Sequence, residues 1–199
     1  PLDIVMVHSE GRVSGHLIPG QFTHGAVYLG SEAQLRAAGL WSTPALVPYH
    51  AQISAGEVYL EAVDEGVVLS SADVVLNTDA TVILRPRLTQ SSARAALSRG
   101  VARMGTPFDI LFDTSSTDEL FCVELIEIMY QNLNLPSLVA YDTQTIIPDV
   151  IVAGTLLGEV PFDLDVRVFN HKMINAFAVP GGHVVLFKGL LDAAGSPEE

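Results

Sequence analysis

The sequence holds few of the residues that cross-link a chain or bind a metal ion. There is one cysteine among the 199 residues, so an internal disulfide is excluded and the thiol is free. No CxxC pair and no HExxH motif occurs, so we expect no zinc, no other metal and no cofactor. No apolar run approaches the ~20 residues of a membrane-spanning helix, and the N-terminus lacks the basic and then apolar layout of a signal peptide.

Basic residues are scarce as well. The chain has 10 Lys and Arg against 23 Asp and Glu, a formal net charge of -13, which excludes nucleic acid as an expected partner because phosphate recognition needs a basic surface. Half of the basic residues cluster at Arg85, Arg87, Arg94, Arg99 and Arg103. We interpret this cluster as a solvated helix face, with a patch for an anionic substrate or lipid headgroup as the alternative.

Apolar residues, in contrast, are abundant enough for a substantial core. They make up 49% of the chain and charged residues 17%, which is typical of a compact domain rather than a disordered one. Strands are expected over 2–7, 24–30, 57–63, 66–69 and 81–85, and helices over 31–38, around Arg94 to Arg103, after Cys122 and over 149–157. A loop is expected over 41–50. Antiparallel-looking strands with separated helices predict the α+β class.

The single cysteine, Cys122, lies at an amphipathic segment of helical period. Leu125, Ile126, Met129 and Leu133 fall on one face, and Glu124, Glu127 and Gln131 on the other. Candidate N-caps run from Ser115 to Asp118, and Ser116 with Glu119 has capping-box spacing, which would place the helix start before the cysteine. Cys122 is therefore either a reactive thiol near a helix N-terminus or an inert core thiol on the apolar stripe.

Two further residues have the chemistry to serve a cysteine nucleophile. His24 opens a short strand, and Glu61 shares one face of the expected strand 57–63 with Tyr59 and Val63. A buried carboxylate needs a partner, and imidazole is a suitable one. The carboxylate fixes the tautomer and stabilises the imidazolium that forms when the other ring nitrogen takes a thiol proton. The alternatives are a structural histidine and a glutamate at an exposed sheet edge.

Four segments follow one another along the chain: PGQFTHGAVYLG, YLEAVDEGVVL, GTPFDILFD and FCVELIEIMY. Together, over roughly residues 1–155, they resemble the circularly permuted papain-like amidases of the YiiX/YaeF type, relatives of the NlpC-type cell-wall peptidases. In that family the order is histidine, then an acidic or polar residue, then cysteine, as here. The resemblance implies a permuted papain-like (NlpC-type) domain with Cys122 as nucleophile, His24 as base and Glu61 as orienting group. The family usually has a serine after the cysteine, where this chain has Val123.

The C-terminal residues carry a second resemblance. From Phe169 they read FNHKMINAFAVPGGHVVLFKGLLDAAGSPEE. The part from Asn175 to Leu191 is similar to a hairpin segment of HtpX-type zinc metallopeptidases, in which the HExxH helix comes next. We therefore divide the chain into a permuted papain-like amidase domain over 1–160 and a C-terminal β-hairpin extension over 161–199 that resembles the start of a metallopeptidase domain.

Three functional hypotheses follow. The first is a cysteine hydrolase that cleaves an amide bond through a thiolate and an acyl-enzyme. The resemblance implies a peptidoglycan peptide or N-acyl amino acid as its substrate, with a lipid ester as the nearest variant. The second is a fragment or proform of a two-domain zinc metallopeptidase, and the third is a catalytically inactive binding module. Expected partners are thus a small amide, peptide or lipid-linked substrate. Peripheral membrane contact and the oligomeric state stay open, and only the resemblance suggests the cell envelope or periplasm.

Overall fold

The centre of the protein is a six-stranded antiparallel sheet. The computed structural model describes residues 1–8, 21–112, 118–131, 138–140, 143–156, 162–166, 176–179 and 183–186. The strands lie in the order β4-β3-β2-β1-β5-β8, and each neighbouring pair is antiparallel. Their bounds are β1 Asp3–His8, β2 His24–Tyr28, β3 Glu57–Val63, β4 Gly66–Ser71, β5 Ala80–Pro86 and β8 Phe162–Val166.

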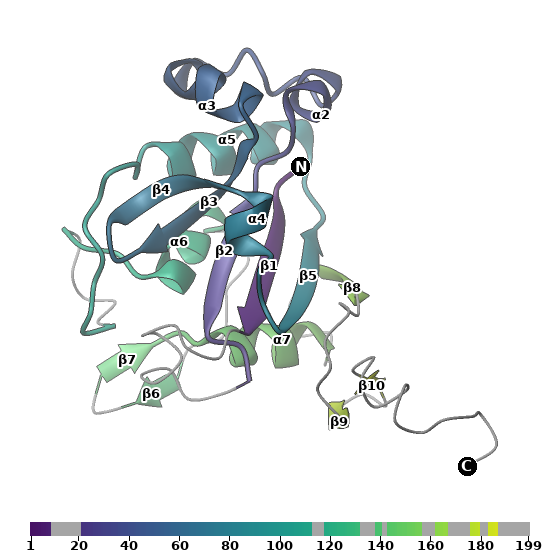
Figure 1. The fold of residues 1–199 in the computed structure, drawn as a ribbon. Coiled ribbons are helices and arrows are strands. Elements are labelled where there is room, and N and C mark those ends of the chain that lie inside the picture. The colour runs from purple at the N-terminus through teal and green to yellow at the C-terminus, as the bar shows by residue number, and fades with distance from the viewer. Residues whose placement is uncertain are drawn as a thin grey trace.

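Helices cover the sheet unequally. Figure 1 shows α5 and α6 together behind the sheet, the short α4 in front of it, and α2 and α3 beyond one end. The helices are α2 Glu32–Ala37, η1 Pro44–Tyr49, α3 His50–Ser54, α4 Ala72–Val75, α5 Gln90–Val101, α6 Cys122–Met129 and α7 Pro148–Leu156. Two small strand pairs complete the described elements: β6 Leu138–Ala140 with β7 Thr143–Thr145, and β9 Ala176–Val179 with β10 His183–Leu186. The α+β class is confirmed, and β9 and β10 form the expected C-terminal hairpin.

Both faces of the central strands are buried, because side chains alternate along a strand. The face toward α5 and α6 carries the main core, which includes Ile4, Met6, Val27, Leu60, Leu97, Leu125, Ile126 and Met129. The other face carries a smaller cluster of Val5, Val7, Ala26, Tyr59 and Val75. Fully burying a Leu or Ile side chain stabilises a fold by about 1.5–3 kcal/mol, so the main core dominates the stability.

Two glycines let α6 approach its neighbours closely. A Cβ on Gly25 of β2 would lie 2.8 Å from Cδ1 of Ile126, and a Cβ on Gly100 of α5 would lie 2.7 Å from Sδ of Met129. Both distances are shorter than real Cβ atoms show, so a larger residue at either position would require the end of the Ile126 or Met129 side chain to shift. The first residue of α6 is thereby held against the strand that begins with His24.

The expected loop over 41–50 is wrong in part. Residues 44–49 form the 3-10 helix η1, and α3 begins at His50. Pro44 lies in the first turn of η1, where its missing N–H needs no helical partner, so it does not interrupt the structure. The ring of His50 stacks on Trp41 with centroids 3.8 Å apart, which closes this segment on itself.

Candidate active site

His24 and Glu61 lie on adjacent strands and contact each other. Ala26 of β2 pairs with Glu61 of β3, so His24 at the start of β2 is a diagonal neighbour on the same face. Its Nε2 lies 2.7 Å from Oε2 of Glu61, in a pair whose two residues are only 3% and 1% exposed. The carboxylate is therefore inside the protein, and the placement of Glu61 at an exposed sheet edge is wrong.

Cys122 is the first residue of α6. The N-cap is Phe121, which is extended and provides no side-chain cap. A helix start at Ser116 or Asp118 is therefore wrong; of the candidate caps, Ser115 to Thr117 lie outside the described residues. The correction matters because the positive end of the helix dipole acts only over the first turn. The Cys122 sulfur lies in that turn, where a helix stabilises a thiolate.

The structure also joins His24 to Cys122. The Cys122 thiol lies close enough to the imidazole to raise the pKa of His24 through hydrogen bonding and charge. Because Nε2 faces Glu61, Nδ1 is the ring nitrogen left for the sulfur. Burial alone would lower the pKa of His24. The hydrogen bonds and charges of Cys122 and Glu61 outweigh it, and the pKa is raised from 6.5 to about 9. The arrangement thus favours an imidazolium beside the sulfur at neutral pH.

The two residues that follow the cysteine are both buried. Val123 packs in the main core, so its side chain contributes packing at the position where the family usually has a serine. Glu124 is 6% exposed, and its assignment to the outer polar face of the helix is wrong. The physical reason is that α6 is enclosed on several sides: the sheet and α5 cover it, and buried Asp109 from the segment before it lies close enough to act on Glu124. The helical period of the apolar residues predicts one buried face of α6. It cannot predict that a polar residue on another face is buried as well.

A contact that the sequence does not reveal fixes the chain just before His24. Asp149 lies in the first turn of α7, and its two carboxylate oxygens accept the backbone N–H groups of Gln21 and Phe22, each at 2.8 Å. The partners are 128 and 127 residues apart in the chain. No local signal predicts such a pairing, because Asp149 reads simply as an acidic residue in a helix start.

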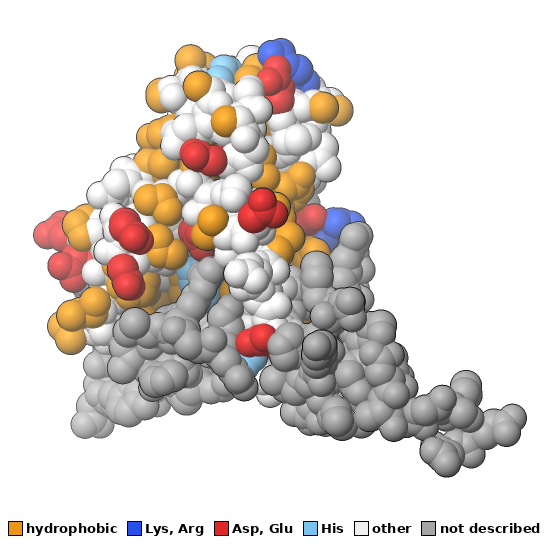
Figure 2. Space-filling model, viewed as in Figure 1, with side chains coloured by type: hydrophobic (Ala, Val, Ile, Leu, Met, Phe, Trp, Pro, Cys, Tyr) orange, Lys and Arg blue, Asp and Glu red, His pale blue; other side chains and the backbone are white. Residues whose placement is uncertain are grey.

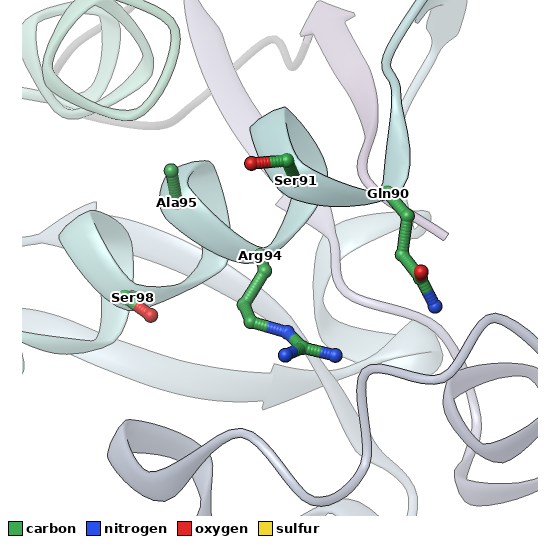
Figure 3. A pocket seen from close by; sticks show the side chains of 5 residues that line it. All are labelled: Gln90, Ser91, Arg94, Ala95 and Ser98. Atoms are coloured by element: carbon green, nitrogen blue, oxygen red, sulfur yellow. The ribbon is translucent and has the colours of Figure 1, made fainter.

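Three residues of the arginine cluster make hydrogen bonds to other parts of the protein. Arg85 forms a two-fold hydrogen bond with Asp3, and Arg99 donates to the carbonyl groups at the end of α6. Arg94 donates to the carbonyl oxygen of Gly39 at 2.9 Å, and Gln90 to that of Ala38. Figure 3 shows these last two side chains extending from α5 beside a shallow hollow. The arginines therefore fasten elements together, which neither sequence interpretation anticipated.

The charged side chains on the visible face are mainly acidic. Figure 2 shows Asp and Glu side chains spread over the face that it displays, with basic side chains gathered near the top and at the right edge. Among the described residues, no group of three His, Cys, Asp or Glu side chains is placed to hold a metal ion. In the same part of the chain, no helix has both the length and the apolar character needed to cross a membrane.

Comparison with known proteins identifies the fold family. Comparisons with curated proteins and with solved structures gave no match. Nothing found supports the resemblance of residues 169–199 to HtpX-type metallopeptidases. A family described as permuted papain-like amidase enzyme, YaeF/YiiX, C92 family, matches residues 3–150, which include His24, Glu61 and Cys122. The match covers most of the chain, and the antiparallel sheet with its packed helices has the architecture expected of the family. The chain therefore belongs to the permuted papain-like amidases of the YaeF/YiiX type, a family of cysteine hydrolases.

Proposed function

We propose that the protein cleaves an amide bond with Cys122 as nucleophile, His24 as general base and acid, and Glu61 as the group that orients His24. The observation that carries this proposal is the position of the His24 ring between the other two side chains. It bonds to Glu61 through Nε2, the Cys122 thiol acts on it closely enough to raise its pKa, and all three residues are buried. A nucleophile, a base within hydrogen-bond reach and a third group on the base are the features of such a site.

The proposed reaction has two steps. In the proposed resting state the proton of the Cys122 thiol is already on His24, as the raised pKa of the ring favours, and the thiolate attacks the amide carbonyl carbon to form a tetrahedral intermediate. His24 then passes the proton to the leaving amine as the C–N bond breaks, which leaves an acyl group on the sulfur. A water molecule, deprotonated by His24, attacks the thioester, and the thiol and the free acid are regenerated.

Helix geometry supplies a group to stabilise the oxyanion. The first N–H groups of an α-helix have no partner within the helix, and Cys122 is the first residue of α6. Its backbone N–H is therefore suited to donate to the negatively charged oxygen of the tetrahedral intermediate. Loss of one such donor slows related reactions by about 100- to 1,000-fold.

The finer substrate class is also part of the proposal. Membership of the amidase family supports a peptide or other amide substrate. Within that class we propose a peptidoglycan peptide or an N-acyl amino acid, with a lipid ester as the nearest variant. The net charge of -13 favours a neutral or cationic substrate over a strongly anionic one, because like charges repel on approach.

Substitution of the three residues tests the proposal. The purified protein would be incubated with muropeptides and with a panel of N-acyl amino acids, and the products followed by mass spectrometry. Cys122→Ser should remain folded but inactive, and His24→Ala should lose about as much activity. Glu61→Gln should keep a weak residual activity of about 1% of the wild-type rate or less. Full hydrolysis by Cys122→Ser would show that the cysteine only packs, and an inactive wild-type protein with an unreactive thiol would favour a binding module.

A further inference from the structure

Glu124 is a buried carboxylate that the proposed mechanism leaves unused. It is the third residue of α6, two residues beyond Cys122, and is nine-tenths buried. As the third residue of α6 it is in the position from which a glutamate reaches back to the backbone N–H of the N-cap, here Phe121, and hydrogen bonding by that N–H lowers the pKa of Glu124. The side chain therefore reaches back across the turn that carries the nucleophile. Since Phe121 provides no side-chain cap, this bond is what Glu124 contributes to the helix start.

The surroundings of Glu124 make it titrate in the neutral range. Burial raises its pKa most strongly; the Phe121 N–H lowers it, the charges of Asp109 and Glu127 raise it, and Arg103 lowers it. The resulting pKa is about 7. Within the described structure, Oε2 of Glu124 has no hydrogen-bond partner, so one oxygen of a buried carboxylate is held without compensation. Because burial disfavours the charged form of this carboxylate, a small change of pH near its pKa changes its charge.

We propose that Glu124 is a positioning residue whose ionised carboxylate holds the turn from Phe121 to Cys122 in the place that His24 requires, and whose protonation loosens that turn. This inference rests on the proposed function of Cys122 and His24. A charged oxygen is a stronger acceptor of an N–H bond than a neutral one. A bond that favours the ionised form is in turn strengthened by ionisation, because the two equilibria are linked.

The coupling runs through the backbone of Phe121. The charges that act on Glu124 come from Asp109 before α6, Glu127 one turn along α6 and Arg103 after α5. Those that act on His24 come from Cys122 and Glu61. No side chain belongs to both sets. The connection between Glu124 and His24 is therefore the backbone from Phe121, whose N–H acts on Glu124, to Cys122, whose thiol acts on His24. The reactivity of Cys122 should then fall as the pH drops through about 7 and Glu124 takes up a proton.

Alkylation of the single cysteine provides a direct test. Iodoacetamide can label no other thiol in the chain, so intact-mass measurements report on Cys122 alone. The wild-type protein, Glu124→Gln and the matched control Glu119→Gln would be compared between about pH 5.5 and about pH 8.5. Glu119 is an exposed glutamate close before α6, and it is not one of the groups whose charge shifts the pKa of Glu124. Glutamine retains an acceptor oxygen that does not titrate. The ratio of wild-type to Glu124→Gln rates should rise about threefold or more through neutral pH, while the ratio of wild-type to Glu119→Gln rates stays constant.

A second variant keeps the test decisive if Glu124→Gln does not fold. Asp109→Asn retains an oxygen for the N–H of Leu111 but removes a charge that raises the pKa of Glu124. The neutral-pH step should then move down by about half a pH unit or more. A constant ratio of wild-type to Glu124→Gln rates, or an unmoved step in Asp109→Asn, overturns the inference. If His24→Ala alkylates as fast as the wild type, it is the proposed function that fails instead.

Discussion

His24 is the residue through which the other two candidate side chains act on each other. It bonds to Glu61, its pKa is raised by the nearby Cys122 thiol as well, and it is buried with both residues. A neutral imidazole would be favoured by burial alone. The two neighbours reverse that preference, so the ring holds the proton that the proposed mechanism delivers to the leaving amine.

The titration of His24 is therefore expected to lie near pH 9. In the unfolded chain the ring has its ordinary pKa of about 6.5, so protonated His24 stabilises the fold fully below that pH. This stabilisation is lost as the pH rises through about 9. Urea unfolding of the wild type and of His24→Gln at several pH values should show a difference in unfolding free energy that shrinks over this range.

Glu61→Gln provides the matched comparison for that titration. Removing the carboxylate charge should lower the pKa of His24 by about one unit or more, because an opposite charge at hydrogen-bond distance favours the imidazolium. NMR titration of the ring protons, assigned with His24→Gln, measures the shift. A ring that titrates near pH 6.5 in the wild type, or at the same pH in Glu61→Gln, would contradict the role of Glu61.

At the scale of elements, the site depends on how α6 and β2 are fastened. Arg99 of α5 donates to the carbonyl oxygens of Ile128 and Met129, at the C-terminal end of α6. Glu124 acts at the other end of the same helix. Asp149 of α7 holds the chain that leads into β2. Glu124 and Asp149 thus act at the element ends that carry Cys122 and His24, and Arg99 holds the opposite end of α6.

Removing the Asp149 carboxylate should loosen the start of β2. In Asp149→Ala the N–H groups of Gln21 and Phe22 lose their acceptors, which should reduce the unfolding free energy by about 1–3 kcal/mol. Urea denaturation measures this change. Asp73→Ala is the control, since Asp73 also lies in the first turn of a helix but is exposed. Equal effects of the two substitutions would show that the Asp149 bonds add nothing beyond a helix-end charge.

At the scale of the whole molecule, the sheet extends past the predicted domain division at residue 160. β8 pairs with β5 from Pro86↔Phe162 to Val82↔Val166, and so becomes the sixth strand. An exposed β5 would present unpaired backbone groups at the edge of the sheet. The division into 1–160 and 161–199 stays a prediction, and the pairing of β8 shows how it can be tested.

Two shortened chains would place the division. A chain ending at residue 168 keeps β8, and one ending at residue 160 lacks it. The longer chain should be more stable by about 2–4 kcal/mol, since a strand pairing of several net hydrogen bonds is retained. The shorter one should also scatter more light on concentration, because its sheet edge is open. Equal stability and equal scattering would place the boundary before β8.

The sequence alone determined the class of the fold and the three candidate residues. Period-two and helical patterns are local, so they predicted the α+β class, most strands of the sheet and the helix after Cys122. The order of His24, Glu61 and Cys122, with the segments around them, predicted the family that the comparison then identified. These features are encoded in short stretches of chain, and a reader of the sequence has direct access to them.

Only the tertiary structure decided how those residues are held. It placed the start of α6 at Cys122, buried Glu124 from a second side and brought Asp149 to the chain before His24. Each of these outcomes depends on contacts between segments far apart in sequence. A carboxylate looks the same in the sequence whether water or a buried N–H group will surround it. The difference arises from packing, which creates the low-dielectric surroundings that shift its pKa and fix its partner.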